Sequence, residues 1–241
     1  MNNQDFDPEL ISILTPTYNR HKFLPLYIMN LQTIDYPKEL LEVVIDDDGA
    51  DAFIKDLDAF KNAIAPIKVN YMRYKNRRSI GEKRNNLVKR SSQSHKVVVY
   101  MDDDDIYHPS YIRYSFNQLR LNKARLVGSN QMIFLYPEDN FKITGIRCEK
   151  KYQAHEATMM MTKRYHRSMG GFAKSSQGEG AKIIQDRDKD VFMTDIRYIM
   201  ICVAHDGNTI DKDIFKDKDD INNEEVMKLP QVQVLKDILK I

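Results

Sequence analysis

Four short apolar runs alternate with helix-like segments through the first half of the sequence, and this alternation constrains the fold more than any other feature. Each run has the length of a buried strand, and the segments between the runs carry apolar residues at helical spacing. A repeated strand–helix pattern predicts an α/β fold, a mostly parallel, doubly wound sheet with helices on both faces. The expected strands are 10–14, 41–45, 67–72 and 97–101, and the expected helices are 21–32, 51–62, 80–90 and 109–121.

The second half is less regular and predicts a smaller β region. We expect a strand with a turn at 125–136, its hairpin partner at 141–146, and further strands at 157–161 and 198–204. A glycine-containing loop is expected at 169–180, and a terminal helix at 226–239. Because no linker composition interrupts the chain, we expect one domain over 1–241. Its parts would be 1–122, 123–210 and a polar tail with the terminal helix, 211–241.

Charge and cysteine content exclude several classes of protein. Lys and Arg total 37 against 35 Asp and Glu, a net charge of +2, which is too close to neutral for a general nucleic-acid binder. Only Cys148 and Cys202 are present, so no disulfide framework is indicated. The N-terminal residues form no apolar signal core, and no run is long enough to span a membrane. We therefore expect a cytoplasmic protein without a transmembrane segment.

Polar motifs follow three of the four expected strands. They are 15–20, 46–48 and 102–105. Parallel α/β sheets bind their ligands at the carboxyl ends of the strands, so these motifs predict a ligand site at one edge of the sheet.

The run Asp102–Asp105 directly after the fourth strand predicts a metal site. Four adjacent carboxylates repel one another unless a cation joins them. A hard divalent cation such as Mn²⁺ or Mg²⁺ prefers oxygen ligands of this kind. The alternative is a solvated acidic turn without a ligand.

These motifs, in this order, resemble those of family 2 glycosyltransferases, which have the GT-A fold. The resemblance rests on Ile11–Arg20, Val43–Gly49, Ile80–Asn85 and Met101–Asp105 with Pro109, within roughly the first 110 residues. It implies a donor-binding first half, a metal held by an Asp-x-Asp segment, and inversion at the sugar. The extra Asp in Asp46–Asp48 leaves the register of the base-reading Asp open by one. The implied donor contacts are Thr15, Thr17, Tyr18, Arg20, Asp47, Asp48, Gly81, Lys83, Arg84, Asp102 and Asp103.

A looser resemblance in the second half implies the acceptor and catalytic side. Glu179 stands where the family has its catalytic acid residue, often within a Glu-Asp pair, whereas here Gly180 follows. We expect Glu179 to be the general base, with Asp186, Asp188 and Asp195 as further candidates. His205 resembles a late histidine that would join Asp102 and Asp104 at the metal.

The resemblance therefore implies a metal-dependent hexosyltransferase that moves a sugar from a nucleotide diphosphate, UDP by family habit, to a saccharide or other hydroxyl acceptor. Two alternatives stay open. A nucleotidyltransferase acting on a sugar phosphate also uses a parallel sheet, a metal and Asp clusters, but 15–20 lacks the glycines of its usual first loop. A non-catalytic nucleotide-sugar-binding module is the other.

Overall fold

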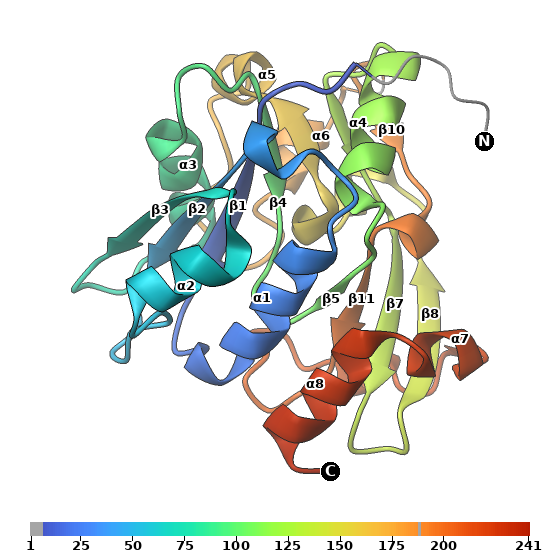
Figure 1. The fold of residues 1–241 in the computed structure, drawn as a ribbon. Coiled ribbons are helices and arrows are strands. Elements are labelled where there is room, and N and C mark those ends of the chain that lie inside the picture. Colours follow the sequence, from blue (N-terminus) through green and yellow to red (C-terminus); the bar gives the residue numbers. More distant parts are fainter. Residues whose placement is uncertain (1–6, 188) are drawn as a thin grey trace.

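The apolar runs of the sequence form a seven-stranded sheet in the computed structural model, which describes residues 7–187 and 189–241 (Figure 1). The strand order is β10-β6-β9-β4-β1-β2-β3. The strands are β1 (Ile11–Thr17), β2 (Leu41–Asp47), β3 (Lys68–Arg73), β4 (Val97–Tyr100), β6 (Leu126–Gly128), β9 (Met160–Thr162) and β10 (Val191–Met193).

The sheet is mostly parallel, as predicted. β1 lies parallel to β2 and β4, β2 lies parallel to β3, and β6 lies parallel to β10. β9 is the exception, because it runs antiparallel to both β4 and β6. β1 and β2 are buried along almost their whole length, as expected for strands that are covered on both faces.

Alternate residues of the strands face two different layers of helices. Ile13 and Val43 belong to the same apolar cluster as Tyr27 and Phe60, on the face covered by α1 (Leu24–Thr33), α2 (Leu57–Ile64) and α4 (Tyr111–Leu121). Leu14 packs in a second cluster on the opposite face. The helices of that face are α3 (Ile80–Arg90), α5 (Lys163–Ser168) and α6 (Ala181–Ile184). Figure 1 shows α1 and α2 in front of β1–β3.

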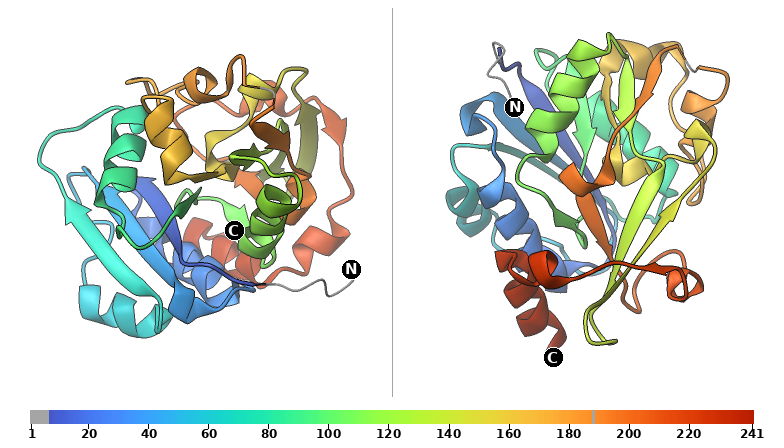
Figure 2. Two further views of the ribbon diagram at one scale, coloured as in Figure 1. Left: turned by 90° about the horizontal axis from the view of Figure 1, so that it is seen from above. Right: turned by 90° about the vertical axis from the view of Figure 1, so that its right-hand side faces the viewer.

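A second sheet of five strands, in the order β12-β8-β7-β11-β5, packs on the C-terminal helix (Figure 2). β7 and β8 form the predicted antiparallel hairpin. Leu135, Ile143 and Val203 of this sheet share an apolar cluster with Val232 and Leu235. The elements are β5 (Ile106–Tyr107), β7 (Gln131–Tyr136), β8 (Lys142–Arg147), β11 (Met200–Val203), β12 (Asp219–Asp220), α7 (Glu224–Met227) and α8 (Pro230–Leu239).

Several boundaries differ from the sequence predictions for local reasons. α2 begins at Leu57, because the Asp56 side chain accepts a hydrogen bond from Ala59 N and caps the helix there. The expected strand at 125–136 is two strands, one in each sheet. The expected helix at 226–239 is divided by Pro230, which opens α8. Short 3-10 turns are η1 (His21–Phe23), η2 (Lys38–Leu40), η3 (Lys151–Gln153), η4 (Glu156–Thr158), η5 (Ile196–Tyr198) and η6 (Asp213–Phe215).

The parallel register brings the predicted motifs to one edge of the sheet. Thr17 lies beside Asp47 across β1 and β2, and Leu14 lies beside Tyr100 across β1 and β4. The segments that follow these strands therefore leave the sheet side by side. Among the described helices, none is both long and apolar enough to cross a membrane.

Candidate active site

A cleft of about 640 Å³ opens at the carboxyl ends of β1, β2 and β4. Its walls come from the segments after these strands, the start of α3, the loop before α6 and the segment after β11. The lining residues include Thr17, Tyr18, Arg20, Asp48, Arg77, Lys83, Arg84, Asp102–Asp105, His155, Glu156, Glu179 and Lys212. Most of the predicted donor and metal residues thus share one cleft.

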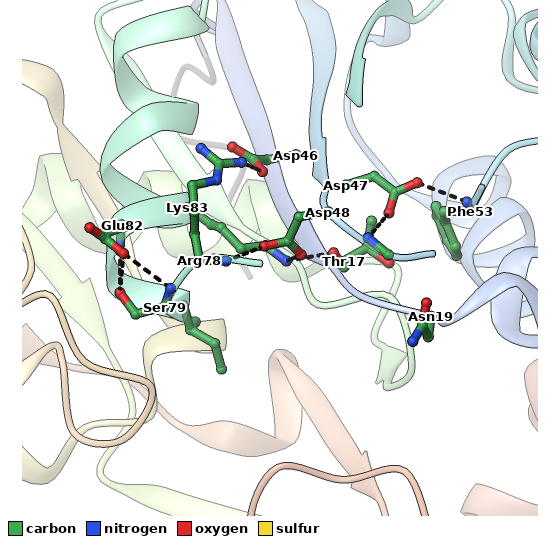
Figure 3. Close-up of polar contacts among 12 residues, drawn as sticks. Thr17, Asn19, Asp46, Asp47, Asp48, Phe53, Arg78, Ser79, Glu82 and Lys83 are labelled. Atoms are coloured by element: carbon green, nitrogen blue, oxygen red, sulfur yellow. Dashed lines mark hydrogen bonds and ion pairs between the residues drawn. The ribbon is translucent and has the colours of Figure 1, made fainter. Parts of the chain in front are cut away.

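Lys83 ties three elements together at the cleft wall (Figure 3). Its ammonium donates to the Thr17 carbonyl at 2.5 Å and to Asp48 Oδ1 at 2.5 Å. Asp48 Oδ2 accepts from Arg78 N at 2.7 Å. Lys83 is buried, and its charge is balanced by Asp48 within the protein. Asp48 and Lys83 thereby hold the start of α3 against the ends of β1 and β2.

Three predicted donor residues, Thr15, Asp47 and Gly81, do not line the cleft. The Asp47 carboxylate accepts from Gly49 N and Phe53 N, both at 2.9 Å (Figure 3). It also accepts from the Tyr71 hydroxyl at 2.6 Å. Thr15 is fully buried, and its hydroxyl donates to the Met101 carbonyl at 2.8 Å. Both side chains thus hold the strand ends in place, and Asp48 is the member of the second motif that faces the cleft.

Gly81 also lies behind the cleft wall, where α3 meets the loop before α6. Its N–H donates to the Ser175 carbonyl at 2.8 Å. A Cβ atom at this position would lie 1.8 Å from the carbonyl oxygen of Ala173. The glycine therefore permits a backbone contact that brings the loop carrying Glu179 against α3.

Gly81→Ala is expected to destabilise the protein by about 1–3 kcal/mol, because the new methyl group meets backbone that cannot swing aside. Urea unfolding followed by circular dichroism measures this free energy. Lys89→Ala, at an exposed position of the same helix, is the matched control and should change stability by less than about 0.5 kcal/mol. An alanine variant as stable as the wild type would contradict the packing described here.

Each carboxylate of the acidic run has its own partners. Asp103 accepts a short hydrogen bond from the Thr17 hydroxyl. Asp104 Oδ2 lies 3.1 Å from Arg20 Nε and 3.0 Å from His205 Nε2. Asp105 accepts from Val203 N at 2.9 Å and lies 3.7 Å from Lys212 Nζ. The run therefore joins β4 to the segments after β1 and β11.

The surroundings do not favour a charge on every member of the run. Burial raises the pKa of Asp105 to about 7 and, together with the charge of Asp104, raises the pKa of Asp103 well above its usual value. Burial alone would also raise the pKa of Asp104, but the His205 hydrogen bond and the Arg20 charge hold it below its usual value. More positive charge is needed before all four carboxylates ionise together.

The same residues are chemically suited to a divalent cation. Asp102 Oδ1 is buried and accepts no hydrogen bond, and burial lowers the pKa of His205, which favours its neutral, metal-binding form. Carboxylate oxygens with one imidazole nitrogen are ligands that Mn²⁺ accepts. In the described part of the chain, no three acidic, histidine or cysteine side chains are arranged around one point as metal ligands would be. Asp104 instead contacts His205 and Arg20 directly. Asp102, Asp104 and His205 are nevertheless the residues that could hold a cation here.

Arg84 links the acidic run to the opposite wall. Its Nε lies 3.0 Å from Glu179 Oε1, and its Nη2 lies 3.3 Å from Asp102 Oδ1. Burial lowers the pKa of the guanidinium, but the two carboxylates more than compensate and the net shift is upward, so Arg84 stays charged. Its buried Nη1 has no hydrogen-bond partner among the described residues. A polar donor is therefore left for a ligand.

Glu156, His155 and Lys212 line the cleft but were not predicted from the sequence. Glu156 Oε1 accepts from Gly180 N at 2.9 Å, and burial together with the charge of Glu179 raises the pKa of Glu156 to about 7. Burial lowers the pKa of His155 to about 3. Lys212 belongs to the predicted polar tail, yet it pairs with Asp105. The segment 148–156 has no hydrophobic periodicity and 211–225 is mostly Asp, Lys, Asn and Glu, so no sequence signal singles these residues out.

Other predicted residues lie at the edge of the cleft or away from it. Arg77 stacks over the Tyr18 ring, with 4.3 Å between the guanidinium carbon and the ring centroid. Asp186 is exposed and Asp195 pairs with Arg197 at 2.6 Å, and neither lines the cleft. Asp188 lies outside the described residues.

Comparison with known proteins agrees with this architecture. The family model for glycosyl transferase family 2 matches residues 12–174. TarS from S. aureus bound to UDP-GlcNAc superposes with a TM-score of 0.66 at 13% identity, over 95% of this chain and 71% of that one. The mannosyltransferase PcManGT from Pyrobaculum calidifontis, in complex with GDP-Man and Mn²⁺, gives 0.64 at 14% identity, over 85% of this chain and 61% of that one.

Another TarS structure superposes with a TM-score of 0.62 at 14% identity, over 80% of this chain. The match spans only 60% of that TarS chain, so this chain covers part of the length of the structures it resembles. No curated protein sequence matches it. The structural likeness at this identity shows the fold, and the family model covers more than half of the chain. The chain therefore belongs to glycosyl transferase family 2 and has its GT-A fold.

Proposed function

We propose that this protein transfers a sugar from a nucleotide diphosphate to an acceptor hydroxyl, with the help of a divalent cation and with inversion at the sugar. The observation that carries the proposal is the cleft itself. It brings Asp102 and Asp104 within one site with the buried cation Arg84, and places two further carboxylates, Glu156 and Glu179, in the same walls. A nucleotide-sugar needs positive charge at its diphosphate and a carboxylate near the acceptor.

The donor would lie along the ends of β1 and β2. Tyr18, with Arg77 on its ring, offers a flat surface for the base, and Asp48 lines the same cleft. The unpartnered Nη1 of Arg84 would donate to a phosphate oxygen, which is a strong charge-assisted contact. UDP-GlcNAc and GDP-Man, which the compared structures hold, define the donors to test first.

Asp102 and Asp104, with His205, would hold Mn²⁺ or Mg²⁺ next to the diphosphate. When bound, the cation supplies positive charge that stabilises the departing nucleoside diphosphate. Arg20 and Arg84 already flank the two carboxylates and keep the site charged and oriented.

The transfer would be a single in-line displacement. The acceptor oxygen forms its bond to the sugar as the bond to the diphosphate breaks, so the configuration at the sugar inverts. The acceptor hydroxyl gives its proton to a carboxylate of the opposite wall, and a base in this position typically contributes on the order of 10²–10⁴ in rate. The sequence-predicted base, Glu179, lies in that wall beside Glu156.

The leaving group distinguishes this function from the two alternatives. We expect that incubation with a panel of nucleotide-sugars, hydroxyl acceptors and Mn²⁺ releases nucleoside diphosphate, detected by phosphorus NMR. Release of pyrophosphate from a nucleoside triphosphate and a sugar phosphate would indicate a nucleotidyltransferase. Binding of donors without turnover across the panel would indicate a non-catalytic module and would overturn the proposal.

A further inference from the structure

Glu156 occupies the space that a side chain at position 180 would take. Its Oε1 accepts a hydrogen bond from Gly180 N at 2.9 Å. A Cβ atom at Gly180 would lie 2.8 Å from Glu156 Cγ, 2.9 Å from Glu156 Oε1 and 2.8 Å from the flexible end of Met159, its Cε, which is closer than real Cβ contacts come. Glu156 is the first residue of η4, and its side chain reaches into the cleft wall. The space that it fills is open because residue 180 has no side chain.

The neighbouring Glu179 is committed to a different partner. It is buried, and its Oε1 accepts from Arg84 Nε at 3.0 Å. Protonating Glu179 would break this ion pair and leave Arg84 with Asp102 as its remaining carboxylate neighbour. Within the residues that the structure describes, Glu156 forms no ion pair with a basic side chain. Glu156 is therefore the carboxylate of this wall that can take up a proton without losing a salt bridge.

We propose that Glu156, rather than Glu179, accepts the proton of the acceptor hydroxyl, and that Glu179 is a positioning residue that holds Arg84. The inference rests on the proposed glycosyl transfer. In that step the acceptor oxygen bonds to the sugar carbon, the electron pair of the broken bond leaves with the nucleoside diphosphate, and the proton moves to the Glu156 carboxylate. Glycine at position 180 is then required, because it makes room for the base.

The electrostatic surroundings agree with this assignment. Burial and the charge of Glu179 raise the pKa of Glu156 to about 7, while Arg84 and the Gly180 N–H act in the opposite direction. A general base must be ionised, so kcat/KM should rise about tenfold per pH unit below this pKa and level off above it. Glu156→Gln should remove that rising limb, whereas Glu179→Gln should keep it.

A first experiment tests by thermal unfolding whether residues 156 and 180 compete for the same space, and it needs no activity assay. Gly180→Ala should lower the Tm of the otherwise unchanged protein by roughly 2–4 °C, because the methyl group displaces the Glu156 side chain. In the Glu156→Ala background the same substitution should cost clearly less. Equal losses of Tm in both backgrounds would show that residues 156 and 180 do not compete for the space, and would overturn the inference.

A second experiment moves the carboxylate. Glu156→Ala should lower kcat by about 10²–10⁴ with little change in donor affinity. Adding Gly180→Asp should raise kcat at least about tenfold above that of Glu156→Ala alone. The reason is that the Cβ atom of the new side chain would lie 2.9 Å from the position of Glu156 Oε1, so its carboxylate begins close to the one that was removed. Gly180→Asn in the same background carries no charge and is the matched control. Glu149→Gln, an exposed glutamate nearby, should turn over at the wild-type rate.

The outcomes separate the inference from the proposed function. An active wild type whose Glu156→Gln variant keeps its full rate overturns the assignment of Glu156 alone. No gain of the aspartate variant over the asparagine variant overturns it as well. A wild type that releases no nucleoside diphosphate from any donor refutes glycosyl transfer, and the inference falls with it.

Discussion

Replacing Arg84 with methionine is expected to destabilise the protein by about 3–5 kcal/mol, because the substitution leaves buried carboxylates without their cation. Glu179 lies 3.0 Å and Asp102 lies 3.3 Å from this guanidinium, whose side chain is only 4% exposed. The variant should also lose measurable affinity for nucleoside diphosphates, since it removes the phosphate donor. Urea unfolding and calorimetry measure the two effects.

Arg125→Met is the matched control for the loss of an ion pair. Arg125 pairs with Asp190 at 3.2 Å, but its side chain is 61% exposed, and such pairs contribute about 0–1 kcal/mol. Arg84→Lys keeps the charge without the planar donor pattern and should fall between the wild type and Arg84→Met. A methionine variant within about 1 kcal/mol of the wild type would show that the buried network is not what holds this wall together.

Asp104→Ala is expected to abolish the dependence of nucleotide binding on metal. In the wild type, Mn²⁺ should tighten nucleoside diphosphate binding by at least about tenfold over binding in the presence of a chelator, because the cation joins carboxylate and phosphate oxygens. Without Asp104 the two affinities should become equal. Calorimetric titrations with Mn²⁺ and with chelator measure this difference directly.

Controls separate this loss from unfolding. Circular dichroism should show an intact fold for Asp104→Ala, and Asp58→Asn on the exposed face of α2 should bind like the wild type. His205→Ala should weaken the metal effect if the imidazole joins the site, and should lower only the thermal stability if His205 merely packs against Phe23. Equal affinity of the wild type with and without metal would refute the metal site.

The framework of the fold could be predicted because its signals are local. β1, β2 and β4 are rich in apolar residues, and α3 has the predicted N-cap at Ser79. The Ser79 hydroxyl accepts from Glu82 N, and the Glu82 carboxylate accepts from Ser79 N. The parallel direction followed from the helices between the strands. β9 could not be placed in the same way, since its antiparallel direction depends on the aperiodic path of 148–158.

The site was predictable only where it follows the strands. Thr17, Asp48 and Asp102–Asp105 reach the cleft because parallel strands end at one edge. Glu156 and Lys212 reach it through contacts with Gly180 and Asp105, which lie 24 and more than 100 residues away in the chain. The side chains of Thr15 and Asp47 are buried and form hydrogen bonds with backbone groups instead of facing the cleft. Such long-range packing leaves no pattern in the sequence.

A crystal structure with a nucleoside diphosphate and Mn²⁺ tests the central claim most directly, because the claim is that the cleft after β1, β2 and β4 holds the donor. Crystals soaked with UDP and, separately, with GDP would cover both donors of the compared structures. We predict density for the base beside Tyr18 and for the diphosphate between Arg84 and a cation on Asp102 and Asp104. A nucleotide bound elsewhere on the protein, with this cleft empty, would contradict the account.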